Sequence, residues 1–264
     1  MIKKVVFFDV DGTLLEYIKG MTSPLQSTID AIKKLKDNGH VVVIATGRPR
    51  PFLPKEILSM DFHGYITANG AVVERDKALI YSKKIEKGIL KKAVELFKKE
   101  KIVYFLEGYQ KAYFSSLESQ EARDFYEVFG VPRENITDEW KLEDIEANKM
   151  VVTIRDKDTL QRCVEILGND FIFMKHPGAY SYDVYFKDCS KADGIREFLN
   201  YTGLDMKDTY AFGDGQNDIE MIQTVGTGVA MGNAKEELKS HADYVTDDVF
   251  SHGIANALKH FKLI

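Results

Sequence analysis

Two short runs of the chain, Val5–Phe8 and Val41–Ala45, contain only apolar residues. A strand without polar residues is covered on both faces, which is typical of parallel sheets that carry helices on each side. The stretch between the runs has apolar residues at helical spacing, at Ile29, Ile32 and Leu35. Because parallel strands need a crossover connection, usually a helix, this order predicts a β-α-β unit and an α/β chain.

The middle of the chain has a different pattern. Its expected strands alternate more between apolar and polar residues, as half-exposed antiparallel strands do. These strands include Val103–Glu107, Lys149–Arg155 and Ser181–Phe186. After Lys187 the parallel-type pattern returns. We therefore expect a Rossmann-like parallel-sheet core, residues 1–81 and 188–264, with an inserted α+β domain, residues 82–187, whose antiparallel sheet carries helices on one face.

Composition excludes several classes of function. The 264 residues carry 36 Lys and Arg against 41 Asp and Glu, a net charge of −5. Nucleic acids and anionic membranes are polyanions, so neither is an expected partner. The first apolar run stops at Asp9, so it is shorter than the roughly 7–15 apolar residues that a signal peptide needs. With two cysteines, Cys163 and Cys189, we expect reduced thiols and a cytoplasmic protein.

Two acids follow the first apolar run, in the segment Asp9-Val10-Asp11-Gly12-Thr13. Residues two apart in extended backbone point to the same side, so Asp9 and Asp11 converge at the carboxyl end of a parallel strand. Open α/β sheets bind their ligands at that edge. Two close carboxylates repel each other unless a cation or a shared proton relieves them, and carboxylate oxygens suit Mg²⁺.

Two further segments suggest a phosphate site. Thr46 and Gly47 follow the second apolar run, and a hydroxyl beside a glycine amide is a good donor pair for a phosphate oxygen. Taken alone, this pair is more typical of an ordinary turn. Ser190 and Asp193 form a capping box that places Lys191 at the first position of a helix. A cation is unfavourable there unless an anion binds, so either a phosphate ligand or an exposed lysine is expected.

A final acidic segment, Gly213-Asp214-Gly215-Gln216-Asn217-Asp218, follows the expected strand Thr209–Gly213. Glycines allow the tight turn that brings Asp214, Asn217 and Asp218 towards one centre. Together with Asp9 and Asp11, these residues complete a site for a hard cation.

Four segments, DVDGTL, IATGR, SKADGI and GDGQND, match in order the motifs of the haloacid dehalogenase-like superfamily of aspartate-nucleophile phosphatases. The 145 residues from Thr46 to Lys191 contain the inserted domain, as in the large-capped Cof-like subgroup, whose NGA stretch Asn69-Gly70-Ala71 also resembles. In this chain Asn69-Gly70 predicts a two-residue hairpin turn, and the alternative is that Asn69 contacts the substrate directly.

The resemblance implies an Mg²⁺-dependent phosphomonoester hydrolase that works through an aspartyl-phosphate. It implies that Asp9 is the nucleophile and Asp11 the general acid and base. Mg²⁺ would be held by Asp9, the Asp11 carbonyl and Asp214, with Asp218 orienting a water or ligand. The phosphoryl oxygens would be bound by Val10, Thr46, Gly47, Lys191 and Asn217.

Several alternatives stay open. A phosphomutase on the same scaffold and a non-enzymatic phosphoacceptor or metal-binding module also fit the motifs. The substrate could be a sugar phosphate or a phosphorylated cofactor. Between two expected strands of the inserted domain, Pro177-Gly178 predicts a type II turn. A sharper hypothesis is that this loop selects the leaving group. Its candidate residues are Lys175, His176, Tyr180 and Tyr182.

Overall fold

The computed structural model describes residues 3–128, 130–176 and 178–264, and the chain divides into two compact units. The core unit comprises the chain up to Gly47 together with Pro54–Tyr81 and Ser190–Ile264. The second unit comprises Arg48–Leu53 and Ser82–Cys189. The sequence predicted residues 1–81 as one continuous part of the core. The short segment 48–53 instead joins the second unit, because Phe52 packs in its apolar cluster, with its ring 5.7 Å from that of Phe125.

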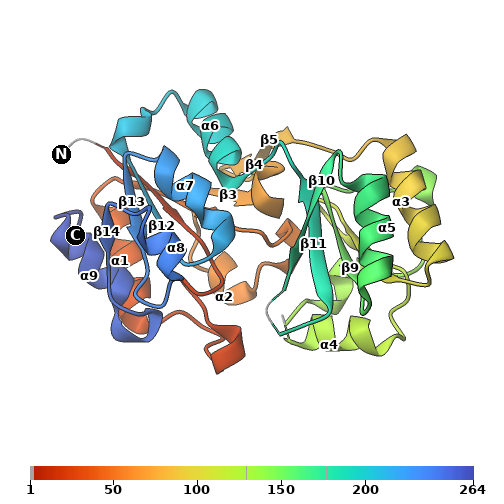
Figure 1. Ribbon diagram of the computed structural model, residues 1–264. Coiled ribbons are helices and arrows are strands. Elements are labelled where there is room, and N and C mark those ends of the chain that lie inside the picture. The colour runs from red at the N-terminus through yellow and green to blue at the C-terminus, as the bar shows by residue number, and fades with distance from the viewer. Residues whose placement is uncertain (1–2, 129, 177) are drawn as a thin grey trace. The chain divides into compact units, whose positions relative to one another are not determined.

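The core unit is built on an eight-stranded sheet in the order β14-β13-β12-β1-β2-β3-β4-β5 (Figure 1). All neighbours from β14 to β3 run parallel, and β4 is antiparallel to β3. The strands are β1 (Val5–Phe8), β2 (Val41–Ala45), β3 (Gly64–Thr67), β4 (Val72–Arg75), β5 (Ala78–Ser82), β12 (Thr209–Gly213), β13 (Thr227–Ala230) and β14 (Tyr244–Val245). The α/β class and the mostly parallel core sheet are thereby confirmed.

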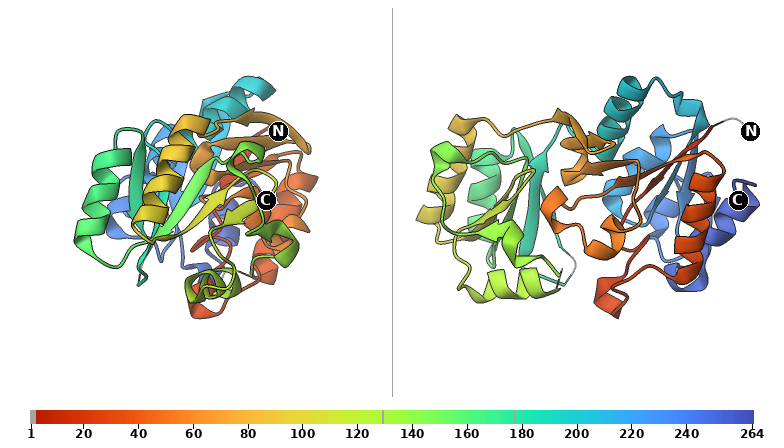
Figure 2. Two further views of the ribbon diagram at one scale, coloured as in Figure 1. Left: turned by 90° about the vertical axis from the view of Figure 1, so that its right-hand side faces the viewer. Right: turned by 180° about the vertical axis from the view of Figure 1, so that it is seen from behind.

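Helices cover both faces of this sheet (Figures 1 and 2). They are α1 (Gln26–Asp37), α2 (Lys55–Leu58), α6 (Lys191–Thr202), α7 (Ile219–Thr224), α8 (Glu236–Lys239) and α9 (Gly253–His260). On one face Phe7 of β1 packs in a cluster with Phe198 of α6 and Met221 of α7. Helices α1 and α9 pack against each other on the opposite face. Burial on both faces explains why β1 and β2 contain no polar residue.

The β3–β4 connection differs from the two-residue turn that Asn69-Gly70 predicted. Thr67 pairs with Val72 across the hairpin, so the connection has four residues, 68–71, which we call the β3–β4 loop. The chain does reverse there, but the loop is longer because it packs against the start of α6. The Gly70 Cα has no room for a side chain, since a Cβ would lie 1.9 Å from the Ser190 carbonyl oxygen.

The second unit contains a six-stranded sheet in the order β10-β11-β9-β6-β7-β8. Every neighbouring pair is antiparallel except β7 and β8, which run parallel. The strands are β6 (Val103–Glu107), β7 (Ala112–Phe114), β8 (Ile136–Thr137), β9 (Lys149–Thr153), β10 (Phe171–Lys175) and β11 (Ser181–Phe186). This agrees with the mostly antiparallel sheet expected from the alternating strands.

Three helices accompany this sheet: α3 (Lys87–Lys99), α4 (Gln120–Val128) and α5 (Lys157–Leu167). Helix α3 packs on one face through Phe97, whose ring lies 5.4 Å from that of Tyr104. The sequence predicted helices on one face only. Helix α4 instead packs against the opposite face, where the Phe125 ring lies 4.9 Å from that of Phe105, the neighbour of Tyr104 along β6.

In the described part of the chain, no helix combines the length and the apolar character that crossing a membrane would require.

Candidate active site

The predicted site residues follow the carboxyl ends of neighbouring core strands. Asp9 comes directly after β1, Thr46 after β2 and Asp214 after β12. Because β12, β1 and β2 are adjacent and parallel, these ends lie at the same edge of the sheet. A short 3-10 turn, Gln216–Asp218, then leads into α7 and returns Asp218 to this edge.

Lys191 joins two of the acids. Its Nζ atom lies 2.6 Å from the Asp9 Oδ1 atom and 2.6 Å from the Asp218 Oδ1 atom. All three side chains are buried, and Lys191 is 1% exposed. Burial alone would lower the pKa of Lys191, but Asp218 and Asp9 outweigh it and raise the pKa. The lysine is therefore a buried cation, and the exposed-lysine interpretation is wrong.

The helix that carries Lys191 starts as the sequence predicted. The Ser190 hydroxyl oxygen accepts a hydrogen bond from the Asp193 amide, and the Asp193 carboxylate accepts one from the Ser190 amide. This capping box fixes the first turn of α6 and leaves Lys191 at its first position. The two carboxylates in contact with Lys191 balance the unfavourable helix dipole there.

Asp218 organises the loop that precedes it. Its Oδ2 atom accepts hydrogen bonds from the amides of Asp214, at 3.0 Å, and Gly215, at 2.9 Å. Since its Oδ1 atom accepts from Lys191, both carboxylate oxygens have partners within the protein. Asp218 therefore links the turn after β12 to the start of α6.

Gly12 allows Asp214 to approach the turn after β1. A Cβ atom on Gly12 would lie 2.1 Å from the Asp214 Oδ2 atom, and Gly12 has a φ angle of +81°. A side chain at this position would therefore be excluded twice, by the backbone conformation and by the carboxylate. Asn233, which the sequence analysis missed, also holds this turn by donating a hydrogen bond to the Gly12 carbonyl oxygen at 2.7 Å.

Asp9, Asp214 and Asp218 form a group that could hold a metal ion, because one carboxylate oxygen from each lies within 4.8 Å of the others. Burial raises the pKa of Asp9 well above its usual range, although Lys191 opposes this shift. Burial and the neighbouring Asp218 raise the pKa of Asp214 to about 7. Three carboxylates, of which those of Asp9 and Asp218 are buried and that of Asp214 is half-buried, leave an excess of negative charge beside one lysine, so the donor set fits a hard divalent cation.

Asp11 lies at the margin of this group. It is half-buried, and its backbone forms a β-bridge with Leu15. Its charge contributes to the raised pKa of both Asp9 and Asp214, which places it close to them, but its side chain is not one of the three grouped carboxylates.

The candidate phosphate-binding groups surround the same edge. Val10 is buried, its carbonyl oxygen accepts the amides of Thr13, Leu14 and Leu15, and its own amide donates to no group within the described residues. Thr46 is fully buried next to Gly47. The Asn217 Nδ2 atom donates to the Asn69 Oδ1 atom at 3.0 Å. Sequence reasoning left Asn69 open between a turn and a substrate contact, and its side chain contacts Asn217.

The residues of the predicted selection loop lie in the second unit, between β10 and β11. The predicted type II turn includes Pro177, which is outside the described residues; Gly178 has a φ angle of +71°. The Tyr180 side chain is 54% exposed and lies under the Arg155 guanidinium, 5.1 Å from its ring centroid. Lys175 pairs with Tyr182 across the two strands.

His176 is held from both sides within the second unit. Its Nε2 atom lies 3.1 Å from the Asp183 Oδ1 atom, and its Nδ1 atom lies 2.8 Å from the Ser181 hydroxyl. Asp183 in turn contacts Lys149 at 2.7 Å, and Lys149 contacts Glu107 at 3.1 Å. Both ring nitrogens of His176 therefore have protein partners, which leaves Lys175, Tyr180 and Tyr182 as the loop's other candidates for ligand contact.

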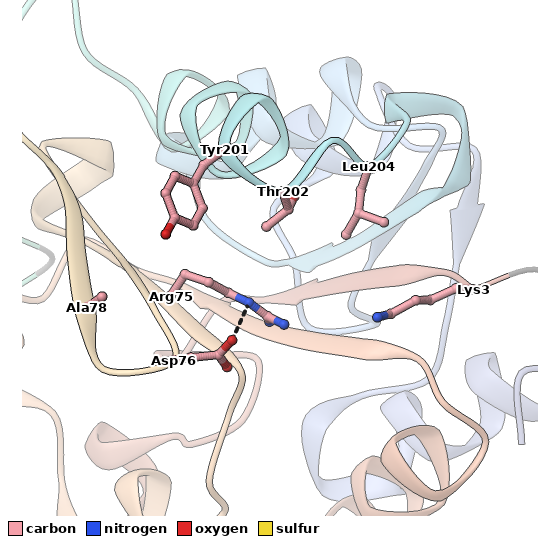
Figure 3. A pocket seen from close by; sticks show the side chains of 7 residues that line it. All are labelled: Lys3, Arg75, Asp76, Ala78, Tyr201, Thr202 and Leu204. Atoms are coloured by element: carbon pink, nitrogen blue, oxygen red, sulfur yellow. Dashed lines mark ion pairs between the residues drawn. The ribbon is translucent and has the colours of Figure 1, made fainter.

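A separate surface pocket of about 320 Å³ lies at the opposite edge of the core sheet (Figure 3). Lys3, before β1, and Arg75, which pairs with the first residue of β3, line it. The Arg75 Nε atom is paired with Asp76 at 3.0 Å. None of the pocket's lining residues belongs to the predicted site.

The sequence and the fold are similar to those of known proteins. Residues 6–258 match the haloacid dehalogenase-like hydrolase family. The Bacillus subtilis protein YkrA is 34% identical over the full length of both chains. The 5-amino-6-(5-phospho-D-ribitylamino)uracil phosphatase YcsE of Bacillus subtilis is 28% identical, covering 98% of this chain and 96% of its own. The crystallised subclass IIB sugar phosphatase BT4131 aligns with a TM-score of 0.85 and 28% identity, over 99% of this chain and 100% of its own. The chain therefore belongs to the haloacid dehalogenase-like hydrolases and is a phosphatase of their subclass IIB.

Proposed function

We propose that the protein hydrolyses small phosphorylated, polyhydroxylated metabolites such as sugar phosphates, with Asp9 as the nucleophile. The observation that carries this proposal is the buried contact of Asp9 with Lys191, beside Asp214 and Asp218. Asp9 lies between a fixed cation and a group of acids that can bind a metal cation. A phosphoryl group that reacts with Asp9 would therefore lie next to the positive charges that stabilise its oxygens.

Mg²⁺ is the metal that we propose for this site. Asp9, Asp214 and the Asp11 carbonyl would hold it, and when bound it would neutralise charge on the transferring phosphoryl group. Asp218 would act indirectly, because its two oxygens already accept hydrogen bonds from Lys191, Asp214 and Gly215. Hard oxygen ligands and the raised pKa of Asp214 support a divalent cation here.

The proposed reaction has two steps. In the first, the Asp9 carboxylate forms a bond to phosphorus while the bond from phosphorus to the leaving oxygen breaks, and Asp11 gives that oxygen a proton. In the second, Asp11 takes a proton from water, whose oxygen attacks phosphorus and releases inorganic phosphate and Asp9. Asp11 is suited to both transfers because it is half-buried and close enough to Asp9 for its charge to raise the pKa of Asp9.

Five groups would bind the phosphoryl oxygens. The Val10 amide has no protein acceptor in the described chain, the Lys191 ammonium is held by Asp9 and Asp218, and the Asn217 amide is fixed by Asn69. Thr46 and Gly47 would add the hydroxyl and amide that follow β2. Phosphoryl transfer depends mostly on such positioning and charge neutralisation, because little other covalent chemistry is needed.

For the inserted domain, residues 82–187, we propose the role of a substrate-selecting cap. The names of the relatives support this class of substrate, because the phosphoribitylamino compound of YcsE and the sugar substrates of BT4131 are both phosphorylated and rich in hydroxyls. Lys175, Tyr180 and Tyr182 offer cationic, aromatic and hydroxyl groups on one loop. Replacing Tyr180 by alanine should alter kcat/KM unequally between bulky and small phosphate esters, and a uniform change would assign the loop a structural role.

The test is phosphate release from a panel of sugar phosphates, flavin mononucleotide, pyridoxal phosphate and p-nitrophenyl phosphate. We expect release that EDTA abolishes and Mg²⁺ restores, with the highest kcat/KM for a polyhydroxylated ester. Conversion of hexose 1-phosphate to hexose 6-phosphate without phosphate release, followed by phosphorus NMR, would identify a phosphomutase instead. Neither release nor conversion by the wild type would leave the binding-module alternative.

A further inference from the structure

The β3–β4 loop has an unusual backbone. Three consecutive residues, Ala68, Asn69 and Gly70, have positive φ angles of 51°, 54° and 97°. Glycine adopts this conformation freely, whereas a non-glycine residue such as Ala68 in it costs of the order of 1–3 kcal/mol. Such strain persists only where surrounding contacts fix the chain, and it concentrates at functional sites.

The contacts of Asn69 connect this loop to two segments of the proposed active site. Its backbone amide donates to the Thr46 carbonyl oxygen at 3.1 Å. Its side-chain Oδ1 atom accepts from the Asn217 Nδ2 atom at 3.0 Å. Asn69 is 2% exposed, so both hydrogen bonds are shielded from water.

The lack of space at Gly47 shows how closely the Asn69 side chain approaches the turn after β2. A Cβ atom on Gly47 would lie 2.9 Å from the Asn69 Oδ1 atom and 3.4 Å from the Asn217 Nδ2 atom. Asn69 thus occupies the space that a side chain at position 47 would need. The Asn69 carboxamide lies between the turn after β2 and the loop after β12.

The neighbouring Gly70 connects the same loop to the helix that carries Lys191. Its Cα atom lies 3.0 Å from the position that a Cβ on Gly194 would take, and a Cβ on Gly70 would meet the Ser190 carbonyl oxygen. The β3–β4 loop therefore packs on the first turn of α6. Three segments that carry proposed phosphate-binding groups, at Gly47, Lys191 and Asn217, all contact these two residues or their immediate neighbours.

We propose that Asn69 is a positioning residue that orients the Asn217 amide for the phosphoryl group, an inference that rests on the proposed phosphatase function. A carboxamide has two N–H hydrogens. Donation of one to Asn69 fixes the plane of the Asn217 amide and leaves the second in a defined direction. An unfixed amide would have to lose rotational freedom whenever phosphate binds, which weakens binding and slows the reaction.

The test uses the variant Asn69→Gly, because glycine keeps the positive φ angle and the backbone hydrogen bond to Thr46 while removing the side chain. The affinity of the Mg²⁺-loaded protein for inorganic phosphate is measured by calorimetry, alongside kcat and KM for p-nitrophenyl phosphate. We expect about tenfold weaker phosphate binding and a similar loss of kcat/KM, since hydrogen-bond partners of a site couple at this level. The midpoint for Mg²⁺ should stay unchanged.

The double variant with Asn217→Ala decides whether Asn69 acts through Asn217. We expect it to bind phosphate no more weakly than Asn217→Ala alone. Multiplicative losses in the double variant, or a single variant that binds phosphate like the wild type, would overturn the inference. If the double variant binds phosphate as expected but the wild type turns over no phosphate ester, the proposed function is overturned and the positioning role of Asn69 stays in place. A wild type that binds no phosphate would overturn both.

Discussion

Each unit of the molecule buries a lysine between two carboxylates, yet the two clusters differ in charge balance. In the core, Lys191 lies 2.6 Å from both Asp9 and Asp218. In the second unit, Lys149 lies 2.7 Å from Asp183 and 3.1 Å from Glu107. We refer to these groups as the core cluster and the cap cluster. Both lysines are at least nine-tenths buried, so water does not compensate the charges of either cluster and neighbouring groups must do so.

The cap cluster balances its charge with protein groups and one proton. Although burial opposes it, Lys149 and His176 hold the pKa of Asp183 below its usual range. Burial raises the pKa of Glu107 to about 7, although Lys149 opposes this, so Glu107 can bind a proton near neutrality. The core cluster contains a third carboxylate, Asp214, and the pKa values of Asp9 and Asp214 are both raised. An excess of carboxylates over protein cations, rather than a buried ion pair as such, therefore distinguishes the proposed metal site.

The largest expected effect separates the acids of the two clusters. Asp9→Asn should abolish turnover, by more than about 10⁴-fold, because an amide cannot act as the nucleophile. The matched variant Asp183→Asn should keep kcat for p-nitrophenyl phosphate within about tenfold while lowering the melting temperature. Steady-state kinetics and calorimetry of both variants check this. Substantial residual activity in Asp9→Asn would rule out the covalent mechanism.

Asp11→Asn should produce the next largest loss, of order 10²–10⁴-fold in kcat with alkyl phosphates, because general acid catalysis is lost. The loss should shrink for p-nitrophenyl phosphate, whose leaving group needs no proton. The ratio of the two losses is the measurement, and Asp183→Asn is the control. If both substrates lose activity equally, Asp11 is not the acid.

The two lysines give a third prediction. Lys149→Met leaves Glu107 and Asp183 without their partner, which should lower the free energy of unfolding by about 3–5 kcal/mol. Lys191→Met also leaves two carboxylates, those of Asp9 and Asp218, without their cationic partner, but a divalent cation can bind next to them. Added Mg²⁺ should raise the melting temperature of both variants, because Lys149→Met keeps the core acids, but it should raise that of Lys191→Met by more, since the cation there also replaces the missing partner of Asp9 and Asp218. A rise in Lys149→Met that equals or exceeds the rise in Lys191→Met would contradict this prediction.

The core was more predictable from the sequence than the second unit. Uniformly apolar strands such as Val5–Phe8 need burial on both faces, so β1 and β2 were predicted with the observed bounds. The location of the acids at the carboxyl edge of the sheet follows from the parallel topology alone. The capping box of Ser190 and Asp193 is a local sequence signal for the start of a helix. The short strand Ile136–Thr137 carries neither kind of signal and was missed.

Loop conformation was the least predictable feature. Asn69-Gly70 resembles a two-residue turn, yet packing on α6 expands it to four residues. Asp76 and Lys77 do form a two-residue connection between β4 and β5, with positive φ angles at both positions, although lysine is unusual there. The cap cluster was also missed, because Glu107, Lys149 and Asp183 are far apart in the sequence and come together only by strand register.

The smallest predicted effect is the pH dependence of the cap cluster. The pKa of Glu107 is about 7 in the folded protein against 4.5 for an ordinary glutamate, so between these values the folded state binds more protons than the unfolded state. Its stabilising contribution is complete below pH 4.5 and is lost as the pH rises through 7. At about 1.4 kcal/mol per pH unit, the loss amounts to roughly 3 kcal/mol.

The matched variant Glu107→Gln isolates this contribution, because glutamine does not titrate. Other groups with shifted pKa values, such as His40, His63 and Asp214, are the same in both proteins and cancel in the difference. Asp183 adds no slope in this range, because its pKa is lowered. Calorimetric unfolding of both proteins from pH 5 to 8 should show the wild type losing stability relative to Glu107→Gln. A difference that does not change with pH would mean that Glu107 stays ionised, and that the cap cluster carries its excess charge without a proton.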